Sequence, residues 1–226
     1  MEIPIVRKGK TRGGLISQVS ESERLEAMSR YERVLIDSGY RRVAGVDEAG
    51  RGPLAGPVVS AAVILPEAYR PEKLNDSKQL SAKVRERLFE RLTREAVAWG
   101  VGICAADEID DVNILNATYI SMERALSVLC PQPDYLLIDA LTLKTITIEQ
   151  KAIIKGDALS LSIAAASVIA KVTRDRMMAI YDNLYPNYGF AKHKGYGTAG
   201  HMEKIKKFGL CPIHRATFCH IGNNVI

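Results

Sequence analysis

The sequence predicts an α/β domain with a mixed β-sheet, and two observations support this prediction. Short apolar stretches typical of strands alternate along the chain with stretches in which apolar residues recur at helical spacing. The strand expected at 42–47 and the aliphatic strand expected at 57–65 are joined by a glycine- and proline-rich turn, a pattern typical of a hairpin. A hairpin followed by strands that alternate with helices gives a sheet with both antiparallel and parallel neighbours.

The remaining elements follow from residue spacing and from capping residues. Further strands are expected at 97–105 and 135–139, since both stretches are short and apolar. Ser20, Ser81 and Asn113 each precede a stretch with helical spacing and are suited to cap it. The expected helices span about 20–38, 81–96, 113–129, 159–184 and 198–208.

Composition and charge narrow the class of protein. With 226 residues, 47% hydrophobic and 25% charged, the chain has the composition of a globular domain with a packed core. Its net charge of +5 favours a polyanionic partner but does not identify one. No apolar run approaches the roughly 20 residues of a membrane span, and residues 1–14 lack the apolar run of a secretory signal. The four cysteines show no CxxC spacing, so we expect a cytoplasmic enzyme that does not bind membranes.

Three segments are expected along the chain. Residues 1–40 form a basic N-terminal arm and a helix, and residues 41–185 form the main α/β domain. The sequence becomes polar and irregular after Pro186, so residues 186–226 are expected to form a small helical C-terminal extension.

The first candidate for chemistry is the pair Asp47-Glu48, which follows an apolar strand and precedes Gly50 and Gly52. Two adjacent carboxylates at a buried strand end are costly unless a positive charge compensates them, and a divalent cation provides it. Neighbouring strand residues point to opposite faces, so both acids reach one ion only if the backbone turns, which the glycines make easy. Taken alone, the pair is also compatible with a solvated turn that carries two surface acids.

Two further acids are candidates by position. Asp139 ends the aliphatic run 136–138, and the exit of such a strand is where α/β sheets place ligands. Asp175 lies on the long helix, where Ser167, Lys171 and Asp175 follow one another at four-residue spacing and form one polar stripe. An ordinary ion pair between Lys171 and Asp175 is the competing interpretation of that stripe.

The donor types indicate the kind of metal. Four acids with no histidine among them suit hard, oxygen-preferring ions such as Mg²⁺ or Mn²⁺, and sites of this kind commonly serve phosphodiester hydrolysis. A second cysteine- and histidine-containing set matches no known zinc spacing: it comprises Cys211, His214, Cys219 and His220. The basic segment 193–196, with its tyrosine, is typical either of a nucleic-acid contact or of a plain surface loop.

Taken together, the motifs resemble bacterial ribonuclease HII, the type 2 ribonuclease H family, over about residues 42–220. The matching segments, in order, are GVDEAGRGPLAGPVV (45–59), DSKQLS (76–81), LLIDAL (136–141), SIAAASVIAKVTRDRMM (162–178), HKGYGTAGH (193–201) and HRATF (214–218). The resemblance implies a ribonuclease H-like mixed sheet flanked by helices, with a helical C-terminal portion. It also implies endonucleolytic cleavage of RNA in RNA–DNA hybrids and at single ribonucleotides in duplex DNA, 5′ to the ribonucleotide, leaving 3′-hydroxyl and 5′-phosphate ends.

The resemblance also assigns roles to residues. The metal-binding and catalytic acids carry over onto Asp47, Glu48, Asp139 and Asp175, holding two Mg²⁺ or Mn²⁺ ions. Gly50, Arg51 and Gly52 match the motif that reads the 2′-hydroxyl, the group that separates RNA from DNA. Tyr196 matches the tyrosine that packs on the sugar of the next nucleotide. Backbone phosphates are assigned to Lys78, Ser167 and Lys171, contacts that give affinity without sequence preference.

Two departures and two rival functions accompany this resemblance. Ala140 stands where a glycine is expected and Thr217 where a serine is usual, which predicts altered detail with retained activity. A different ribonuclease H-like nuclease, such as a junction resolvase, would use a similar acidic cluster. A hybrid-binding module without catalysis is the non-enzymatic alternative, and the complete set of acids argues against it. We expect a monomer that serves ribonucleotide removal and primer clearance.

Overall fold

The computed structural model describes residues 20–219, which contain one five-stranded sheet. The strand order is β3-β2-β1-β4-β5. β1 and β2 form the expected antiparallel hairpin and β3 pairs antiparallel with β2, whereas β4 and β5 run parallel to β1 and to each other. The mixed sheet predicted from the sequence is therefore confirmed. The strands span Val43–Ala49 (β1), Val58–Ile64 (β2), Ala98–Cys104 (β3), Tyr135–Asp139 (β4) and Glu149–Ile153 (β5).

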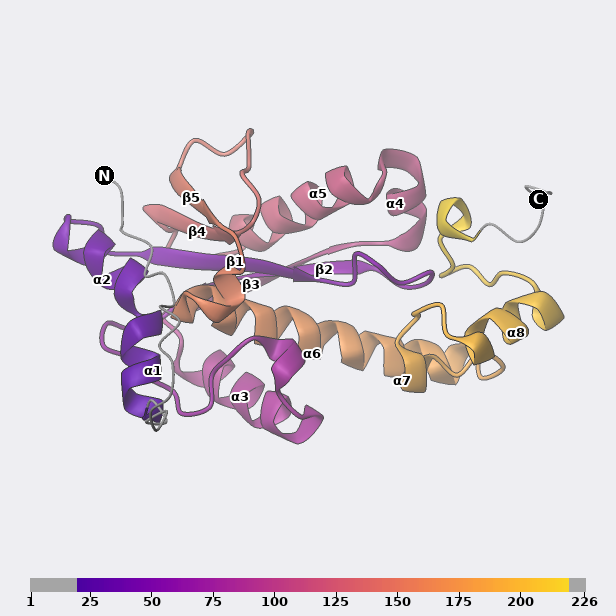
Figure 1. Cartoon of the computed structure of the whole chain (residues 1–226). Helices are drawn as coiled ribbons and strands as arrows, with labels where there is room; N and C mark the ends of the chain where they lie inside the picture. Colours follow the sequence, from indigo (N-terminus) through magenta and orange to yellow (C-terminus); the bar gives the residue numbers. More distant parts are fainter. Residues whose placement is uncertain (1–19, 220–226) are drawn as a thin grey trace, which may run out of the picture.

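Helices cover both faces of the sheet, as Figure 1 shows, with α6 and α3 on one side and α5 on the other. Ser81, Asn113, Ser160 and Thr198 cap α3, α5, α6 and α8 with their side chains. The α-helices span Glu21–Met28 (α1), Arg30–Asp37 (α2), Ala82–Glu95 (α3), Ala106–Val112 (α4), Ile114–Ser127 (α5), Leu161–Leu184 (α6), Phe190–His193 (α7) and Ala199–Phe208 (α8). Short 3₁₀ turns span Ser77–Gln79 (η1), Gly156–Ala158 (η2) and Ala216–Phe218 (η3).

The core has two layers because strand residues alternate between the faces. On β2, Ala61 and Val63 pack toward α6, whereas Ala62 and Ile64 pack toward α5. The alanine-rich start of α6 lies directly on β1, and a side chain on Gly45 would place its Cβ 2.0 Å from the Ser162 carbonyl carbon. This close approach brings the polar residues further along α6 near the ends of the strands.

Several elements differ from the sequence-based expectation, including the short helices α4 and α7, which were not expected. The helix expected at 20–38 is divided at Ser29 into α1 and α2, and Leu25 and Met28 of α1 are buried in the core on the α6 side. The strand β5 was not expected, because it is an edge strand whose residues Glu149–Ile153 are mostly polar and partly exposed. Its position matters, because it ends beside the acids described below.

The C-terminal residues of the described chain pack on the far end of α6. Met178 of α6 shares an apolar cluster with Phe190, Ile205 and Ile213, and with Ala55 from the turn after β1. No helix in the stretch 20–219 is long and apolar enough to cross a membrane. The expected basic arm at 1–19 and residues 220–226 lie outside the described residues.

Candidate active site

Carboxylates gather at one edge of the sheet, where the parallel strands β1, β4 and β5 end side by side. Val46 pairs with Ile138, so Asp47 and Asp139, which follow them, stand next to each other in the sheet. Asp139 in turn pairs with Ile153, the last residue of β5. The carboxyl ends of parallel strands are where open α/β sheets place their ligands, and this edge has that arrangement.

The acid pair on β1 is poorly compensated. Asp47 is 3% exposed, and burial raises its pKa well above the ordinary value, with the neighbouring charges of Glu48 and Asp139 adding to the effect. Burial also raises the pKa of Glu48, against the opposing charge of Arg51, whose Nη1 lies 3.4 Å from Glu48 Oε1. The other carboxylate oxygen of Glu48 is buried without a hydrogen-bond partner among the described residues. The pair therefore has unused capacity to bind a cation.

A fourth acid at this edge is Asp157, which the sequence did not single out. It lies in η2, directly after β5, and is 6% exposed. Burial raises its pKa, and the charges of Asp76 and Asp139 add to that rise. The preceding residue, Gly156, donates its N–H to Asp139 Oδ1 at 2.7 Å, which ties η2 to the end of β4. Asp157 thus lies at the same edge of the sheet as Asp47 and Asp139.

Asp175 occupies a different environment. Its carboxylate accepts a hydrogen bond from Lys171 Nζ at 2.6 Å and lies 3.9 Å from Arg85 Nη2. Ser167, whose hydroxyl lowers the pKa of Asp47, is eight residues earlier on α6, a separation of about 12 Å along a helix axis. The structure therefore leaves Asp175 two turns beyond the acid edge, in the ion pair that was the competing interpretation of this stripe.

The three residues assigned to phosphates divide into two groups. Ser167 is 3% exposed, and its hydroxyl lies 2.9 Å from that of Ser77. Its hydroxyl is therefore bonded inside the protein and is not open to a phosphate. Lys78 is exposed, with Nζ 3.5 Å from Asp157 Oδ2. Lys171 is half-buried, and burial lowers its pKa despite its bond to Asp175. Only the two lysines are placed to meet a phosphate.

The glycine turn and the tyrosine lie beside the acids along one groove. Gly50 has φ +100°, a left-handed conformation that favours glycine. Tyr196 is half exposed and stands beside Gly52, where an added Cβ would lie 3.9 Å from Tyr196 Cε1. The groove is lined by Glu48, Ala49, Gly50, Arg51, Gly52, Ser77, Lys78, Lys171, Arg174 and Tyr196.

Three histidines lie together behind the tyrosine, two joined by a hydrogen bond and the third stacked on one of them. His201 Nδ1 lies 2.9 Å from the Tyr196 carbonyl oxygen, and the Nε2 atoms of His201 and His214 are 3.0 Å apart. Cys211 N–H donates to His214 Nδ1 at 2.9 Å, so the pattern fits neutral imidazoles. The third ring, His193, stacks on His201.

The cysteine- and histidine-containing set shows no sign of a zinc site. Burial lowers the pKa of His214 to about 4. Within the stretch 20–219 no three histidine, cysteine or acidic side chains are already gathered for a metal, and His220 lies outside the described residues. The described members of the set instead take part in local packing and hydrogen bonding, with Cys211 and Cys219 beside the apolar cluster at the end of α6.

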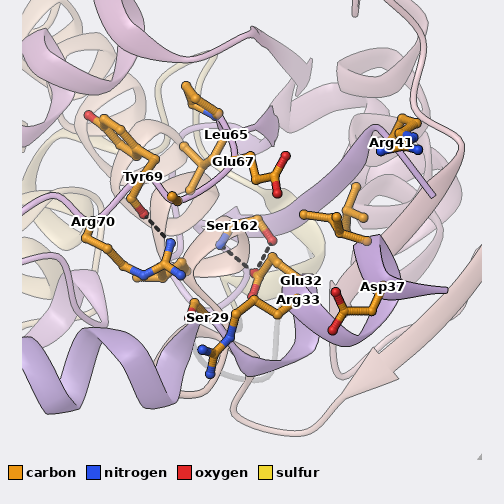
Figure 2. Close-up of a pocket in the computed structure, with 15 residues that line it drawn as sticks. Ser29, Glu32, Arg33, Asp37, Arg41, Leu65, Glu67, Tyr69, Arg70 and Ser162 are labelled. Atoms are coloured by element: carbon orange, nitrogen blue, oxygen red, sulfur yellow. Dashed lines mark hydrogen bonds between the residues drawn. The ribbon is translucent and has the colours of Figure 1, made fainter. Parts of the chain in front are cut away.

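Another hollow, shown in Figure 2, lies at the opposite end of the sheet, where α2 meets the start of α6. There the Glu32 carboxylate accepts hydrogen bonds from the N–H and hydroxyl of Ser162, at 2.9 and 2.7 Å. None of the residues expected to carry chemistry lines this hollow. The groove beside the acids is therefore the candidate active site.

Comparison with known proteins identifies the family. The sequence profile of ribonuclease HII matches residues 44–221. The chain belongs to the ribonuclease HII family. The ribonuclease HII of Ruminiclostridium cellulolyticum is 57% identical over 198 residues, which cover 88% of this chain and 78% of that protein. That of Syntrophotalea carbinolica is 55% identical over 188 residues, covering 83% of this chain and 90% of the relative.

The fold agrees with this membership. The crystal structure of ribonuclease H2 from Pyrococcus horikoshii superposes with a TM-score of 0.66 at 32% identity, covering 78% of this chain and 93% of that chain. The predicted family and the ribonuclease H-like fold are thus confirmed. The chain is a ribonuclease H, a nuclease that cleaves RNA in RNA–DNA hybrids, and membership decides against both a junction resolvase and a hybrid-binding module without catalysis.

Proposed function

We propose that this enzyme cleaves duplex DNA at single embedded ribonucleotides as well as RNA–DNA hybrids, using two divalent metal ions. Cleavage occurs 5′ to the ribonucleotide and leaves 3′-hydroxyl and 5′-phosphate ends. The observation that carries the proposal is the sharing of one groove by Glu48 of the acid edge, the turn 50–52 and Tyr196. A metal site, a 2′-hydroxyl reader and a sugar-packing ring along one groove are the parts that such a reaction needs.

The metal-binding residues in this proposal are Asp47, Glu48, Asp139 and Asp157, with Asp157 replacing Asp175. The buried Glu48 oxygen without a partner and the raised pKa values of three of these acids favour a cation as the missing charge. All four donors are carboxylate oxygens, which suit Mg²⁺ or Mn²⁺. When bound, such ions activate water and stabilise the leaving oxygen of a phosphodiester.

The described side chains are not yet convergent, since no three acids in the stretch 20–219 form a ready-made group. Carboxylates repel one another unless a cation lies between them, so their convergence accompanies metal binding. Asp47 and Asp139 lie at adjacent register positions, and Gly156 ties η2 to Asp139. The backbone therefore already holds the positions of these acids close to one another.

Substrate reading is divided between the glycine turn and Tyr196. Glycines let the backbone of the turn approach the 2′-hydroxyl closely. The exposed ring of Tyr196 packs on the sugar of the next nucleotide, where a deoxyribose presents a flatter apolar face. Lys78 and Lys171 line the same groove and contact phosphates without sequence preference.

The proposal extends to the cell and to the organisation of the chain. The enzyme acts as a cytoplasmic monomer that removes ribonucleotides from DNA during excision repair and clears primers during replication. Residues 41–185 form the catalytic domain, 186–226 an extension that brings Tyr196 to the groove, and 1–40 a basic arm and helix of which α1 and α2 pack on the domain.

A pair of asparagine variants tests the acid assignment. Asp157→Asn removes charge at the acid edge with little change of shape, whereas Asp175→Asn makes the same change two turns away on α6. Cleavage of a duplex with one ribonucleotide should be lost in Asp157→Asn and retained in Asp175→Asn. Thermal unfolding with increasing Mn²⁺ gives a second measurement, because an ion that binds only the folded state raises the unfolding temperature. The assignment is overturned if Asp157→Asn still responds to Mn²⁺ as the wild type does.

Cleavage mapping tests the reaction itself. A labelled duplex holding one ribonucleotide, incubated with Mg²⁺ and then with Mn²⁺, should be cut on the 5′ side of that nucleotide. Tyr196→Ala should weaken the preference for a single ribonucleotide over an RNA run more than it weakens total binding. Cleavage of the hybrid alone, with the single-ribonucleotide duplex intact, would restrict the enzyme to hybrids and contradict the proposal.

A further inference from the structure

Two buried arginines lie beneath the glycine turn. Arg215 is fully buried and Arg174 is 1% exposed, and they are the two largest side chains buried to this degree in the described chain. Every side-chain hydrogen bond recorded for them within the stretch 20–219 goes to a backbone carbonyl and none to a carboxylate. Buried charges are ordinarily paired, because desolvation costs several kcal/mol per ion. Burying two arginines without a carboxylate partner therefore costs free energy of desolvation, and filling space in the core does not account for that cost.

Arg215 gathers the carbonyls of the turn. Its Nη2 donates to Gly50 O at 2.6 Å and to Gly56 O at 2.7 Å, and its Nε also donates to Gly56 O at 2.9 Å. Its Nη1 donates to Arg51 O at 3.0 Å and to Pro53 O at 2.8 Å. One planar guanidinium thus fixes four carbonyls across a seven-residue turn, with all five of its donors in use.

Arg174 joins the turn to the tyrosine loop. It donates to Pro57 O at 3.0 Å, to Ala55 O at 3.1 Å and to Lys194 O at 3.0 Å. Next to this bridge, Leu54 N–H donates to Gly195 O at 2.8 Å. The residue before Tyr196 and the turn after Gly52 are therefore held as one unit.

The direction of these bonds determines what the turn offers to a substrate. The carbonyls of residues 50, 51 and 53 point inward to Arg215, and the N–H groups of Leu54 and Gly56 donate to Gly195 O and Ile213 O. Residues 50–52 line the groove, and within the described chain no partner is recorded for their N–H groups, which leaves these groups for a ligand in the groove. Burial lowers the pKa of Arg215 to about 9, with the charge of Arg174 adding to the effect, but at neutral pH the side chain remains a cation. Two buried cations beneath outward N–H groups favour an electron-rich ligand, which suits a nucleic-acid backbone and its 2′-hydroxyl.

We propose that Arg215 and Arg174 are positioning residues for ribonucleotide recognition. Arg215 holds the turn 50–56 so that the N–H groups of residues 50–52 face the substrate, and Arg174 sets the spacing between that turn and Tyr196. Arg215 does not line the groove, and Arg174 lines it but is only 1% exposed, so both act through the carbonyls that they hold. The proposal deepens the function proposed above and rests on it.

Selective binding is the measurement that separates positioning from mere stability. Two DNA duplexes of the same sequence, one with a single ribonucleotide and one without, are titrated in Mg²⁺ against protein carrying Asp139→Asn, so that neither is cut. The ratio of the two Kd values measures 2′-hydroxyl recognition. Arg215→Lys and Arg174→Lys retain the charge but cannot reproduce the fork of donors. Each should reduce the ratio by about tenfold, since small misplacements of reading groups have effects of that size or larger.

Arg176→Lys is the matched control, since Arg176 lies on the same helix but is exposed and paired with Glu86 at 2.6 Å. It should leave the ratio unchanged. Binding of the all-DNA duplex should change little in all three variants, because phosphate contacts do not depend on the turn. A general loss of structure would instead weaken both duplexes alike, leave the ratio intact and overturn the proposal.

Chemical rescue supplies a second measurement. In Arg215→Ala, millimolar methylguanidinium should restore part of the ratio, whereas methylammonium, which lacks the planar fork, should not. Equal rescue by both cations would show that charge alone matters and would overturn the positioning role of the fork. If the parent protein itself shows no preference for the ribonucleotide, the proposed function fails and not the role of the arginines alone.

Discussion

The two halves of the groove are built in opposite ways. At the acid edge, Glu48 keeps a buried oxygen without a partner, and burial raises the pKa of Asp47 and Asp157. At the glycine turn, Arg215 and Arg174 place their donors on carbonyls and the backbone is fixed. The first half is electrostatically incomplete and the second is saturated with hydrogen bonds. The acid edge should therefore bind a cation that supplies the missing charge. The glycine turn, whose backbone is fixed, should instead select a substrate by its shape.

This difference predicts different responses to substitution. Changes at the acid edge should affect chemistry strongly and stability little, because the acids there contribute unfavourable electrostatics to the fold. Changes at the turn should affect stability and recognition together, because the same hydrogen bonds hold the fold and aim the N–H groups.

The largest effect is expected for Asp139→Asn. The variant keeps the shape of the side chain and can still accept the hydrogen bond from Gly156, but it loses the charge that a metal requires. Cleavage should fall by a factor of about 10² to 10³ or more, as when a key electrostatic group is removed. Binding of the ribonucleotide-containing duplex, measured by fluorescence anisotropy, should remain within the wild-type range. Full turnover in Mg²⁺ would remove Asp139 from the site.

A glycine pair tests the saturated half. Gly50 and Gly39 have nearly the same φ, +100° and +103°, but an added Cβ at Gly50 would lie 2.1 Å from Arg174 Nε, whereas none of the described atoms lies within 4 Å at Gly39. Gly39→Ala should cost about 1 kcal/mol for the left-handed backbone alone. Gly50→Ala should cost about 2 kcal/mol more, because the arginine must move. Urea unfolding of both variants measures the difference, and equal costs would contradict the packing described here.

Acid pH should destabilise the protein through His214, which lies in the histidine cluster behind Tyr196. Because the folded-state pKa of His214 is lowered to about 4, the unfolded chain takes up a proton on this residue first as pH falls. The stabilising contribution is complete above about pH 6.5, the ordinary value, and is lost between there and about pH 4. By pH 5, about 1.5 units below the ordinary value, the loss should be about 2 kcal/mol.

Urea unfolding at pH 7.5 and pH 5 measures that loss. Comparing wild type with His214→Gln removes the contribution of the carboxylates, which both proteins share. The variant should show a flatter pH dependence, and parallel profiles for the two proteins would exclude His214 as the source.

The smallest effect is expected for Ala140→Gly. Ala140 has φ +53°, a left-handed conformation that explains why a glycine was expected after Asp139. Replacement relieves strain of about 1–2 kcal/mol but makes the unfolded chain more flexible, so the net gain should be about 0.5 kcal/mol. Thermal unfolding measures it, and activity should be unchanged. A loss of stability would show that the alanine methyl group contributes packing that outweighs the strain.

The sequence predicted the hairpin, the capped helices and three of the four acids at the sheet edge, because these depend on local periodicity and on acids at the ends of apolar strands. It missed Asp157 because β5, the strand before it, is polar and partly exposed, with Ile153 its only fully buried residue. The stretch Ala152–Ile154 followed by Gly156-Asp157 was the available signal. It was hidden by the more regular stripe on α6, which drew attention to Asp175.

The arginines could not be inferred from the sequence for a different reason. Nothing near Arg215 in the chain indicates that its partners are the carbonyls of the turn 50–56, since such contacts depend on tertiary structure. Thr217 is explained in the same way: its N–H donates to Asp110 Oδ1 at 3.1 Å, and its hydroxyl donates to the same oxygen, a bond that serine also makes. The local sequence pattern identifies candidate residues, whereas their hydrogen-bond partners are set by the tertiary structure.

The separation between Arg215 and its acceptors has a consequence for synthesis. Arg215 Nε bonds to Gly56 O across 159 residues of chain, whereas all four acids of the proposed metal site have been made once Asp157 is in place. At roughly 5–20 residues per second, a nascent chain therefore spends several seconds with its acids complete and its turn unsupported. During that interval the chain lacks the guanidinium that orders the turn. A chain that stops short of Arg215 would therefore carry every acid of the proposed metal site but not the side chain that orders the turn for selective recognition.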